Sequence, residues 1–205
     1  MFQTVPGRTV SRYGGPMPTP RPRTAKESDV LAVATEVLLA DPAASLAQVA
    51  AAAGIGRTTL HRHYPTRRDL LVALAHEAMD LLEEIDVEEA DPGRTGAEDP
   101  LGRMHRLVEQ LLPLGPRLMF LLRAPELDGV PEIAERWARL DQPVVALARR
   151  AQDRGDLDPA LASWWVVESL YALLYSAWEQ VRAGRLAPLD APGLIIRTWL
   201  RGVAP

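Results

Sequence analysis

Apolar residues recur at helical spacing along the chain from about residue 24. Leu46, Val49, Ala50 and Ala53, for example, are spaced i, i+3, i+4 and i+7, which places them on one face of a helix. Beyond residue 100 no segment alternates apolar and polar residues as a strand does. We therefore expect an all-α protein whose helices, with their cap residues, cover the ranges 24–40, 45–54, 56–64, 66–85, 100–112, 117–124, 131–153, 159–183 and 192–202.

Capping residues mark the ends of the first four helices. The segments "TAKE", "SLAQ" and "TRRD" are capping boxes that start helices at Thr24, Ser45 and Thr66. Gly54 is expected to end the second helix and Gly56 to cap the third. Two short helices thus join through a glycine-containing turn, with a helix on each side. This order predicts a helix-turn-helix unit.

Prolines predict further boundaries. Asp99-Pro100 and Asp158-Pro159 each combine an N-cap residue with proline at the first helical position, so we expect a helix to start at each. Pro143 is expected to break or kink the helix that contains it, because proline lacks an N–H and its ring clashes with the preceding turn.

The chain divides at two segments that lack apolar periodicity. Residues 1–23 are rich in Pro, Gly and Arg, which predicts a disordered arm. The acidic, turn-rich stretch "VEEADPGRTGAEDP" follows the first four helices. We expect an N-terminal three-helix helix-turn-helix domain within 24–86, joined by a long helix to a C-terminal helical bundle within 87–205.

The charge is unevenly distributed between these parts. The formal net charge is −4, yet up to Asp80 the chain has nine Lys or Arg against seven Asp or Glu, and after it fourteen against twenty. Around the stretch from Ala53 to Leu71 the basic residues are in mild excess, and such an asymmetry along the chain indicates a polyanion partner for its first part.

Several functional classes lack support in the sequence. The chain has no cysteine, which excludes disulfides and thiolate metal sites and suits the cytoplasm. No apolar run approaches the roughly 20 residues of a membrane span. The segment "HEAMD" lacks the second histidine of a zinc-protease helix, and Gly54-Ile-Gly56 lacks the third glycine of a nucleotide loop. We therefore expect no metal, no cofactor, no membrane association and no enzymatic activity.

The third predicted helix concentrates polar donors on a small surface. Leu60 and Tyr64 share one face and are expected to pack inward. The residues left at its outer surface or N-terminal end are Arg57, Thr58, Thr59, Arg62 and His63. Arginine can hold guanine with two hydrogen bonds, and threonine offers a hydroxyl and a methyl group, so we expect these residues to read base edges in a major groove. Ser45, Thr66 and Arg67, at the starts of neighbouring helices, are expected to hold phosphates.

This region resembles the DNA-binding domain of the TetR family of transcriptional regulators. The resemblance covers the run "SLAQVAAAAGIGRTTLHRHYPTRRDLL", and its matching positions are Gly54, Thr59, Leu60, Tyr64 and Arg67. The family usually has a tyrosine at the position of His61, where it commonly touches a phosphate. We expect His61 to donate a hydrogen bond to a phosphate instead.

The helix predicted at 159–183 is apolar on nearly all sides, so it is expected to be buried on more than one side. The last helix repeats this pattern. The resemblance implies that these two helices pair with their twofold copies in a homodimer. The candidate interface residues are Tyr175, Trp178, Ile195, Ile196 and Trp199.

The resemblance also implies a ligand chamber in the C-terminal domain. The candidate lining residues are Met104, Leu107, Leu111, Met119, Phe120, Trp137, Trp164, Glu168 and Tyr171. Glu168 interrupts a strongly apolar helix, and a buried carboxylate needs a partner. It can face the dimer seam, pair with an arginine such as Arg123, or contact a polar or cationic ligand. The five tryptophans favour an aromatic-walled cavity and a bulky apolar effector.

The leading hypothesis is a homodimeric, ligand-responsive repressor. It binds a near-palindromic double-stranded DNA operator and is released by a small-molecule effector. Two alternatives are a helical small-molecule binding protein that does not regulate DNA and an enzyme built on the C-terminal bundle.

Overall fold

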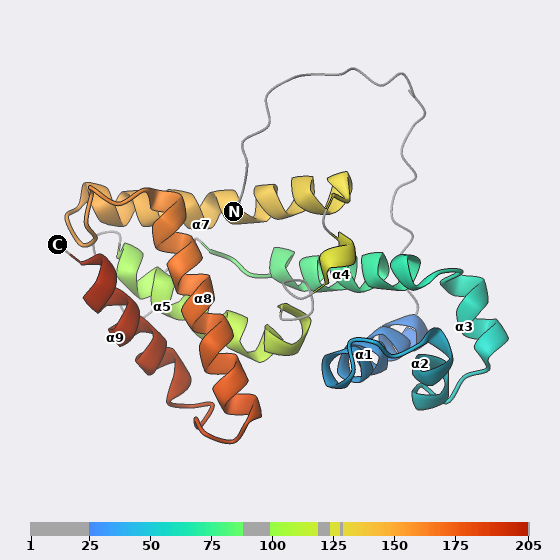
Figure 1. Cartoon of the computed structure of the whole chain (residues 1–205). Coiled ribbons are helices and arrows are strands. Elements are labelled where there is room, and N and C mark those ends of the chain that lie inside the picture. Colours follow the sequence, from blue (N-terminus) through green and yellow to red (C-terminus); the bar gives the residue numbers. More distant parts are fainter. Residues whose placement is uncertain (1–24, 88–98, 119–123, 128, 205) are drawn as a thin grey trace, which may run out of the picture.

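The computed structural model describes residues 25–87, 99–118, 124–127 and 129–204, and every regular element in these ranges is helical (Figure 1). The N-terminal elements are α1 (Ala25–Ala40), α2 (Leu46–Ala52), α3 (Arg57–His63) and α4 (Arg67–Glu83). The C-terminal elements are α5 (Pro100–Leu111), the 3-10 turns η1 (Leu112–Leu114) and η2 (Pro125–Leu127), α7 (Pro131–Asp153), α8 (Ser163–Arg182) and α9 (Ala191–Val203). The predicted all-α class and helix-turn-helix order are confirmed. Thr24, the arm at 1–23 and most of the helix predicted at 117–124 lie outside the described residues, although 115–118 are helical.

The predicted caps define the starts of α2 and α4. The backbone N–H of Gln48 donates to the Ser45 hydroxyl at 3.3 Å, and the Ser45 N–H donates to Gln48 Oε1 at 2.8 Å. Thr66 and Asp69 form the equivalent capping box at α4. Gly54 has a φ of +65°, a left-handed conformation that glycine adopts without steric cost, and it follows the end of α2. This turn lets α3 start at once in a new direction.

Of the two outcomes expected for Pro143, a break or a kink, the break does not occur. The helix α7 is continuous from Pro131 to Asp153. Pro143 lies on the exposed side of α7, where water can bond the carbonyl group that proline leaves without a donor. At the start of α5 the proline-based prediction holds, because Asp99 Oδ1 accepts from the Gly102 N–H at 3.1 Å.

The pair Asp158-Pro159 does not start a helix, so this prediction is wrong. The side chain of Gln152 donates to the carbonyls of Asp158 at 2.8 Å and Leu161 at 2.7 Å. Its Oε1 accepts from the Ser163 hydroxyl at 2.7 Å. These bonds occupy carbonyl groups that a helix starting at Pro159 would use for its own ladder. The helix α8 therefore begins only at Ser163.

Two hydrophobic cores organise the molecule. One joins α1–α4 around side chains such as Leu31, Leu60 and Leu74, and the other joins α5, α7, α8 and α9. The N-terminal core also includes Ala124, Leu127, Val130 and Ile133, which lie beyond the predicted boundary at residue 87. The segment 124–133 thus ties η2 and the first turn of α7 to the helix-turn-helix unit. In Figure 1, α7 runs beside α4 and links the two ends of the molecule. No helix in the described ranges is long and apolar enough to cross a membrane.

Candidate functional site

The helix α3 presents an exposed polar surface because a single leucine anchors it. Leu60 is 1% exposed and packs in the core formed by α1, α2 and α4. Since the helix has seven residues, one inward anchor leaves most other positions facing outward. Arg57, Thr58, His61, Arg62 and His63 are exposed, and Thr59 is half-buried. The residues predicted to read bases therefore share one accessible helix.

The hydroxyl groups of Ser45 and Thr66 act as helix caps. The Ser45 hydroxyl donates to Gln48 Oε1 at 2.8 Å, and the Thr66 hydroxyl donates to Asp69 Oδ2 at 2.7 Å. The side-chain hydrogen bond from Thr66, followed by the bond from its backbone N–H, lowers the pKa of Asp69. Both hydroxyls remain exposed beside the first turns of α2 and α4, where backbone N–H groups point outward.

The side chain of Arg67 is engaged within the protein. Its Nη1 donates to the carbonyl of Ala44 at 2.6 Å, and its Nη2 donates to the carbonyl of Pro42. Its Nε lies 3.5 Å from Glu126 Oε1 on η2. The guanidinium thus joins the α1–α2 turn, the start of α4 and η2. Arg68, the next residue, is exposed. Arg67 and Arg68 are adjacent in the sequence, and their spacing alone does not show which of them bonds to the α1–α2 turn and which is exposed.

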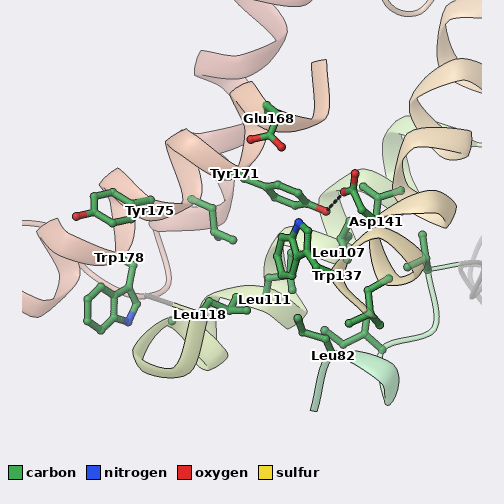
Figure 2. A pocket seen from close by; sticks show the side chains of 16 residues that line it. Leu82, Leu107, Leu111, Leu118, Trp137, Asp141, Glu168, Tyr171, Tyr175 and Trp178 are labelled. Atoms are coloured by element: carbon green, nitrogen blue, oxygen red, sulfur yellow. Dashed lines mark hydrogen bonds between the residues drawn. The ribbon is translucent and has the colours of Figure 1, made fainter. Parts of the chain in front are cut away.

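A cavity of about 140 Å³ lies between the end of α4, α5, residues 115–118, α7 and α8 (Figure 2). Of the predicted lining residues, five contribute to its wall: Leu107, Leu111, Trp137, Glu168 and Tyr171. Met104 is fully buried in the bundle core, and Trp164 is 60% exposed on the surface, so neither lines the cavity. Met119, Phe120 and Arg123 lie outside the described residues. Further lining residues that the sequence reasoning missed include Leu82, Ile85, Leu118 and Asp141.

One end of this cavity is acidic. The Tyr171 hydroxyl donates to Asp141 Oδ1 at 3.0 Å, and Glu168 lies on the same side (Figure 2). Burial raises the pKa of Tyr171 well above its usual value, and the charge of Asp141 adds to this effect. The pKa of Asp141 is raised overall, because burial outweighs the opposing effect of the hydrogen bond from Tyr171. Burial and then the charge of Asp141 raise the pKa of Glu168. Because the charge of Asp141 disfavours a second negative charge on Glu168, a cation bound beside the two carboxylates would be stabilised there.

Aromatic rings complete the wall. Trp137 and Tyr171 meet edge to face, with ring centroids 6.2 Å apart. Trp178 lies against Gly115 so closely that a methyl group there would collide with its indole. Aliphatic side chains from α4 and α5 cover the remaining surface. The cavity therefore combines an apolar, aromatic interior with a charged end.

The residues predicted for a dimer interface lie mainly inside the protomer. Tyr175 and Trp178 line the cavity. Ile195 and Trp199 are each 2% exposed, and the Trp199 indole N–H donates to the carbonyl of Val166 at 3.0 Å, so both belong to the bundle core. Ile196 is half-buried. The large apolar side chains exposed on α8 and α9 are instead Trp164, Trp165 and Leu194. No cluster of His, Cys, Asp and Glu suited to a metal ion occurs among the residues that were described.

Comparison with known proteins agrees with this geometry. The family model described as "Bacterial regulatory proteins, tetR family" matches residues 30–74. The chain is 36% identical over 156 residues to the HTH-type transcriptional repressor LfrR of Mycolicibacterium smegmatis, covering 76% of this chain and 78% of the relative. It is 29% identical over 170 residues to the HTH-type transcriptional regulator NfxB of Pseudomonas aeruginosa, covering 80% and 86%.

The structure is also similar to that of LfrR from Mycobacterium smegmatis in complex with proflavine. The TM-score is 0.69 at 30% identity, and the match covers 88% of this chain and 98% of that one. The relatives are transcriptional regulators and not enzymes. The chain therefore belongs to the TetR family of transcriptional regulators.

Proposed function

We propose that this regulator is a repressor that binds a near-palindromic operator as a homodimer and is released by a small molecule held in the cavity beside α4. The observation that carries the proposal is the exposed donor set on α3, anchored by Leu60. An acidic protein gains DNA affinity from such a surface when a dimer presents it twice, at two half-sites spaced by roughly 34 Å or somewhat more. Its place of action would be the cytoplasm.

The DNA contacts divide by position. The residues assigned to base edges are Arg57, Thr58, Thr59, Arg62 and His63. His61, the N–H groups at the starts of α2 and α4, and Arg68 are assigned to phosphates. Arg68 replaces Arg67 in this role, because the guanidinium of Arg67 is bonded to the carbonyls of the α1–α2 turn.

The effector is proposed to be a flat aromatic cation. The aromatic and aliphatic walls suit a planar ring system, and Asp141 with Glu168 supplies negative charge at one end. The proflavine complex of LfrR supports this class, because proflavine is a planar, positively charged acridine. A cavity of about 140 Å³ is smaller than the roughly 300–1,000 Å³ of typical ligand pockets. Such a ligand must push the walls apart, and Leu82 and Ile85 near the end of α4 belong to those walls.

The homodimer is proposed to cover the exposed apolar side chains of α8 and α9. Trp164 and Trp165 are 60% and 54% exposed, and their rings meet edge to face. Leu194 on α9 is 42% exposed. Exposed aromatic residues of this size favour a protein interface. Sedimentation equilibrium that shows only monomer at micromolar concentration would contradict this assembly.

Selection of bound sequences from random DNA tests the function directly. We expect enrichment of a near-palindrome, followed by its release when proflavine is added. Enrichment without release would limit the proposal to DNA binding. Proflavine binding without any enriched sequence would instead support the alternative, a helical small-molecule binding protein that does not regulate DNA.

A further inference from the structure

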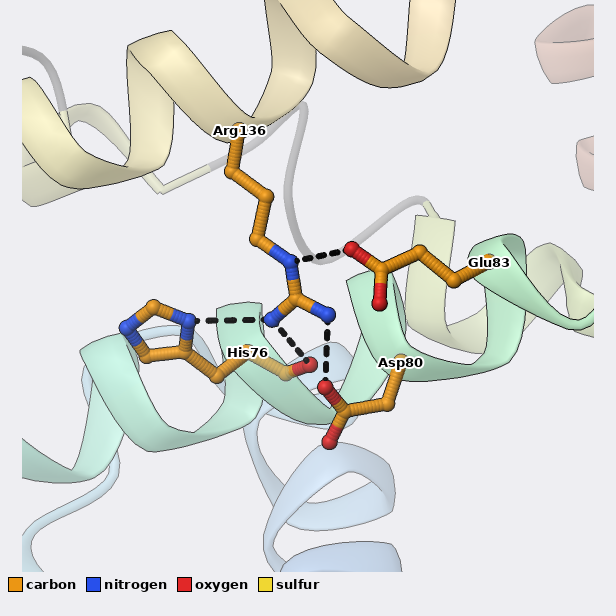
Figure 3. Close-up of polar contacts among 4 residues, drawn as sticks. All are labelled: His76, Asp80, Glu83 and Arg136. Atoms are coloured by element: carbon orange, nitrogen blue, oxygen red, sulfur yellow. Dashed lines mark hydrogen bonds and ion pairs between the residues drawn. The ribbon is translucent and has the colours of Figure 1, made fainter. Parts of the chain in front are cut away.

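Arg136 on α7 lies across α4 and bonds to three of its residues (Figure 3). Its Nε donates to Glu83 Oε1 at 2.9 Å, and its Nη2 donates to Asp80 Oδ1 at 2.6 Å. Its Nη1 lies 3.2 Å from His76 Nδ1 and donates to the His76 carbonyl at 3.3 Å. All three nitrogen atoms of one guanidinium therefore hold successive turns of one helix.

This contact differs from an ordinary surface ion pair. The Arg136 side chain is 13% exposed, whereas those of Asp80 and Glu83 are each 53% exposed. Burial alone would lower the pKa of Arg136, but the hydrogen bonds from it to Glu83 and Asp80, with their charges, raise it overall. Removal of the carboxylates would leave a largely buried cation without its partners, which is costly. The guanidinium is thus held firmly on α4.

The same part of α7 forms a wall of the cavity. Trp137 follows Arg136 directly and lines the cavity, and Leu140 and Asp141 line it one turn further on. An α-helix rises about 1.5 Å per residue and is stiff over such short lengths, so a shift of Trp137 moves Arg136 with it. Trp137, which lines the cavity, and Arg136, which binds α4, are therefore neighbouring residues of one rigid helix.

A second arginine repeats this arrangement on another wall. Arg117 lies beside Leu118, which lines the cavity, and its Nε is 4.0 Å from Glu77 Oε2 on α4. Glu77 is 9% exposed. Two walls of the cavity therefore each carry an arginine that contacts an acidic residue of α4. The contact made by Arg136 is shorter and involves more atoms, so it is the stronger of the two.

We propose that Arg136 is a positioning residue that transmits the displacement of the α7 wall to α4 and so couples the cavity to the DNA-reading helix α3. This inference rests on the proposed function and names the residue through which its two sites communicate. Coupling between two sites is measured as the factor by which one ligand changes the affinity for the other, commonly about 5 to 150. Loss of the link should reduce this factor while each separate affinity persists.

The test compares Arg136→Gln with Arg136→Lys and with Arg139→Gln, a control at an exposed arginine of the same helix. For each full-length protein, operator affinity is measured by fluorescence anisotropy with and without saturating proflavine. Proflavine affinity is measured without DNA. We expect Arg136→Gln to change each separate affinity less than about threefold, whereas its coupling factor falls towards 1. Arg136→Lys should recover part of the coupling, and Arg139→Gln should match the wild type.

The outcomes separate the inference from the function on which it rests. If Arg136→Gln retains more than half of the wild-type coupling on a logarithmic scale, Arg136 is not the link. If Arg136→Gln does not fold, Asp80→Asn with Glu83→Gln removes the partners at exposed positions, and the same threshold applies. A wild-type protein whose operator affinity is unaffected by bound proflavine overturns both the effector proposal and this inference.

Discussion

Arg67 and Arg68 are adjacent arginines whose replacement should have opposite consequences. Arg67 donates to two backbone carbonyls of the α1–α2 turn, and Arg68 is exposed at the start of α4. A hydrogen bond from a charged donor contributes about 1.5–3 kcal/mol when buried. The Arg67 side chain is 34% exposed, so solvent screening reduces the combined effect to roughly 2 kcal/mol. Arg67→Ala should therefore lower Tm by about 4–8 °C in a chain of this size.

Arg68→Ala should leave stability within about 0.5 kcal/mol of the wild type, because its side chain is exposed. Loss of this side chain should lower the affinity for operator DNA and for random DNA by the same factor. Each phosphate contact contributes about 0.9 to the slope of log affinity against log salt concentration, so a dimer that loses two contacts should lose roughly 1.8. Arg68→Lys should retain most of this slope.

The assays are thermal unfolding followed by circular dichroism, and anisotropy titrations of both DNAs between 50 and 200 mM salt, about the range over which counterion release is evident. The two variants are matched controls for each other, since each removes one positive charge from neighbouring positions. If Arg67→Ala melts like the wild type but flattens the salt slope, while Arg68→Ala leaves the slope intact, the assignment of the bracing and phosphate roles is wrong.

Three other changes test the remaining assignments. Asp141→Asn should weaken proflavine binding tenfold or more, roughly the Coulomb contribution of one partly buried charge. In the wild type, proflavine affinity should fall as pH drops towards the raised pKa values of Asp141 and Glu168, since protonation removes the charge that attracts the cation. Fluorescence titration measures both effects, and a neutral aromatic compound of similar size is the control. Leu60→Ala should lower the free energy of unfolding, measured with urea, by about 2–5 kcal/mol, because Leu60 is 1% exposed. A decrease below about 1 kcal/mol would contradict its role as the anchor of α3. Trp165→Ser should raise the dimer dissociation constant in sedimentation at least tenfold while Tm of the protomer is maintained; an unchanged constant would place the interface elsewhere.

Local patterns were sufficient to predict the helix-turn-helix unit. The capping boxes at Ser45 and Thr66 and the left-handed Gly54 act through residues within four positions, so sequence spacing determines them. The turn at Asp158-Pro159 could not be predicted in this way. It depends on Gln152, whose amide reaches carbonyls six and nine residues further on, and such bonds override a local cap signal.

The cavity and the interface were harder to predict for a related reason. A helix apolar on nearly all sides predicts burial but not which side faces the core, the cavity or a second copy. Trp199 and Trp164 both lie in helices predicted to be strongly apolar, yet one is buried and the other is largely exposed. Asp141 was not assigned to the cavity, because its partner, Tyr171, lies thirty residues away on another helix. Tertiary packing decides these positions.

Asp141, one of the two carboxylates at the acidic end of the cavity, lies on the same helix as Arg136, which holds α4, and this bears on how an effector could act. Asp141 follows Arg136 by five residues, about 7.5 Å along α7. A cation attracted to Asp141 therefore engages the element that holds α4 and whose first turn enters the N-terminal core at Ile133. A neutral aromatic of equal affinity fills the cavity without that attraction. Because a ligand shifts an equilibrium only by its difference in affinity for the two states, charge at this end can separate ligands that release DNA from ligands that merely bind.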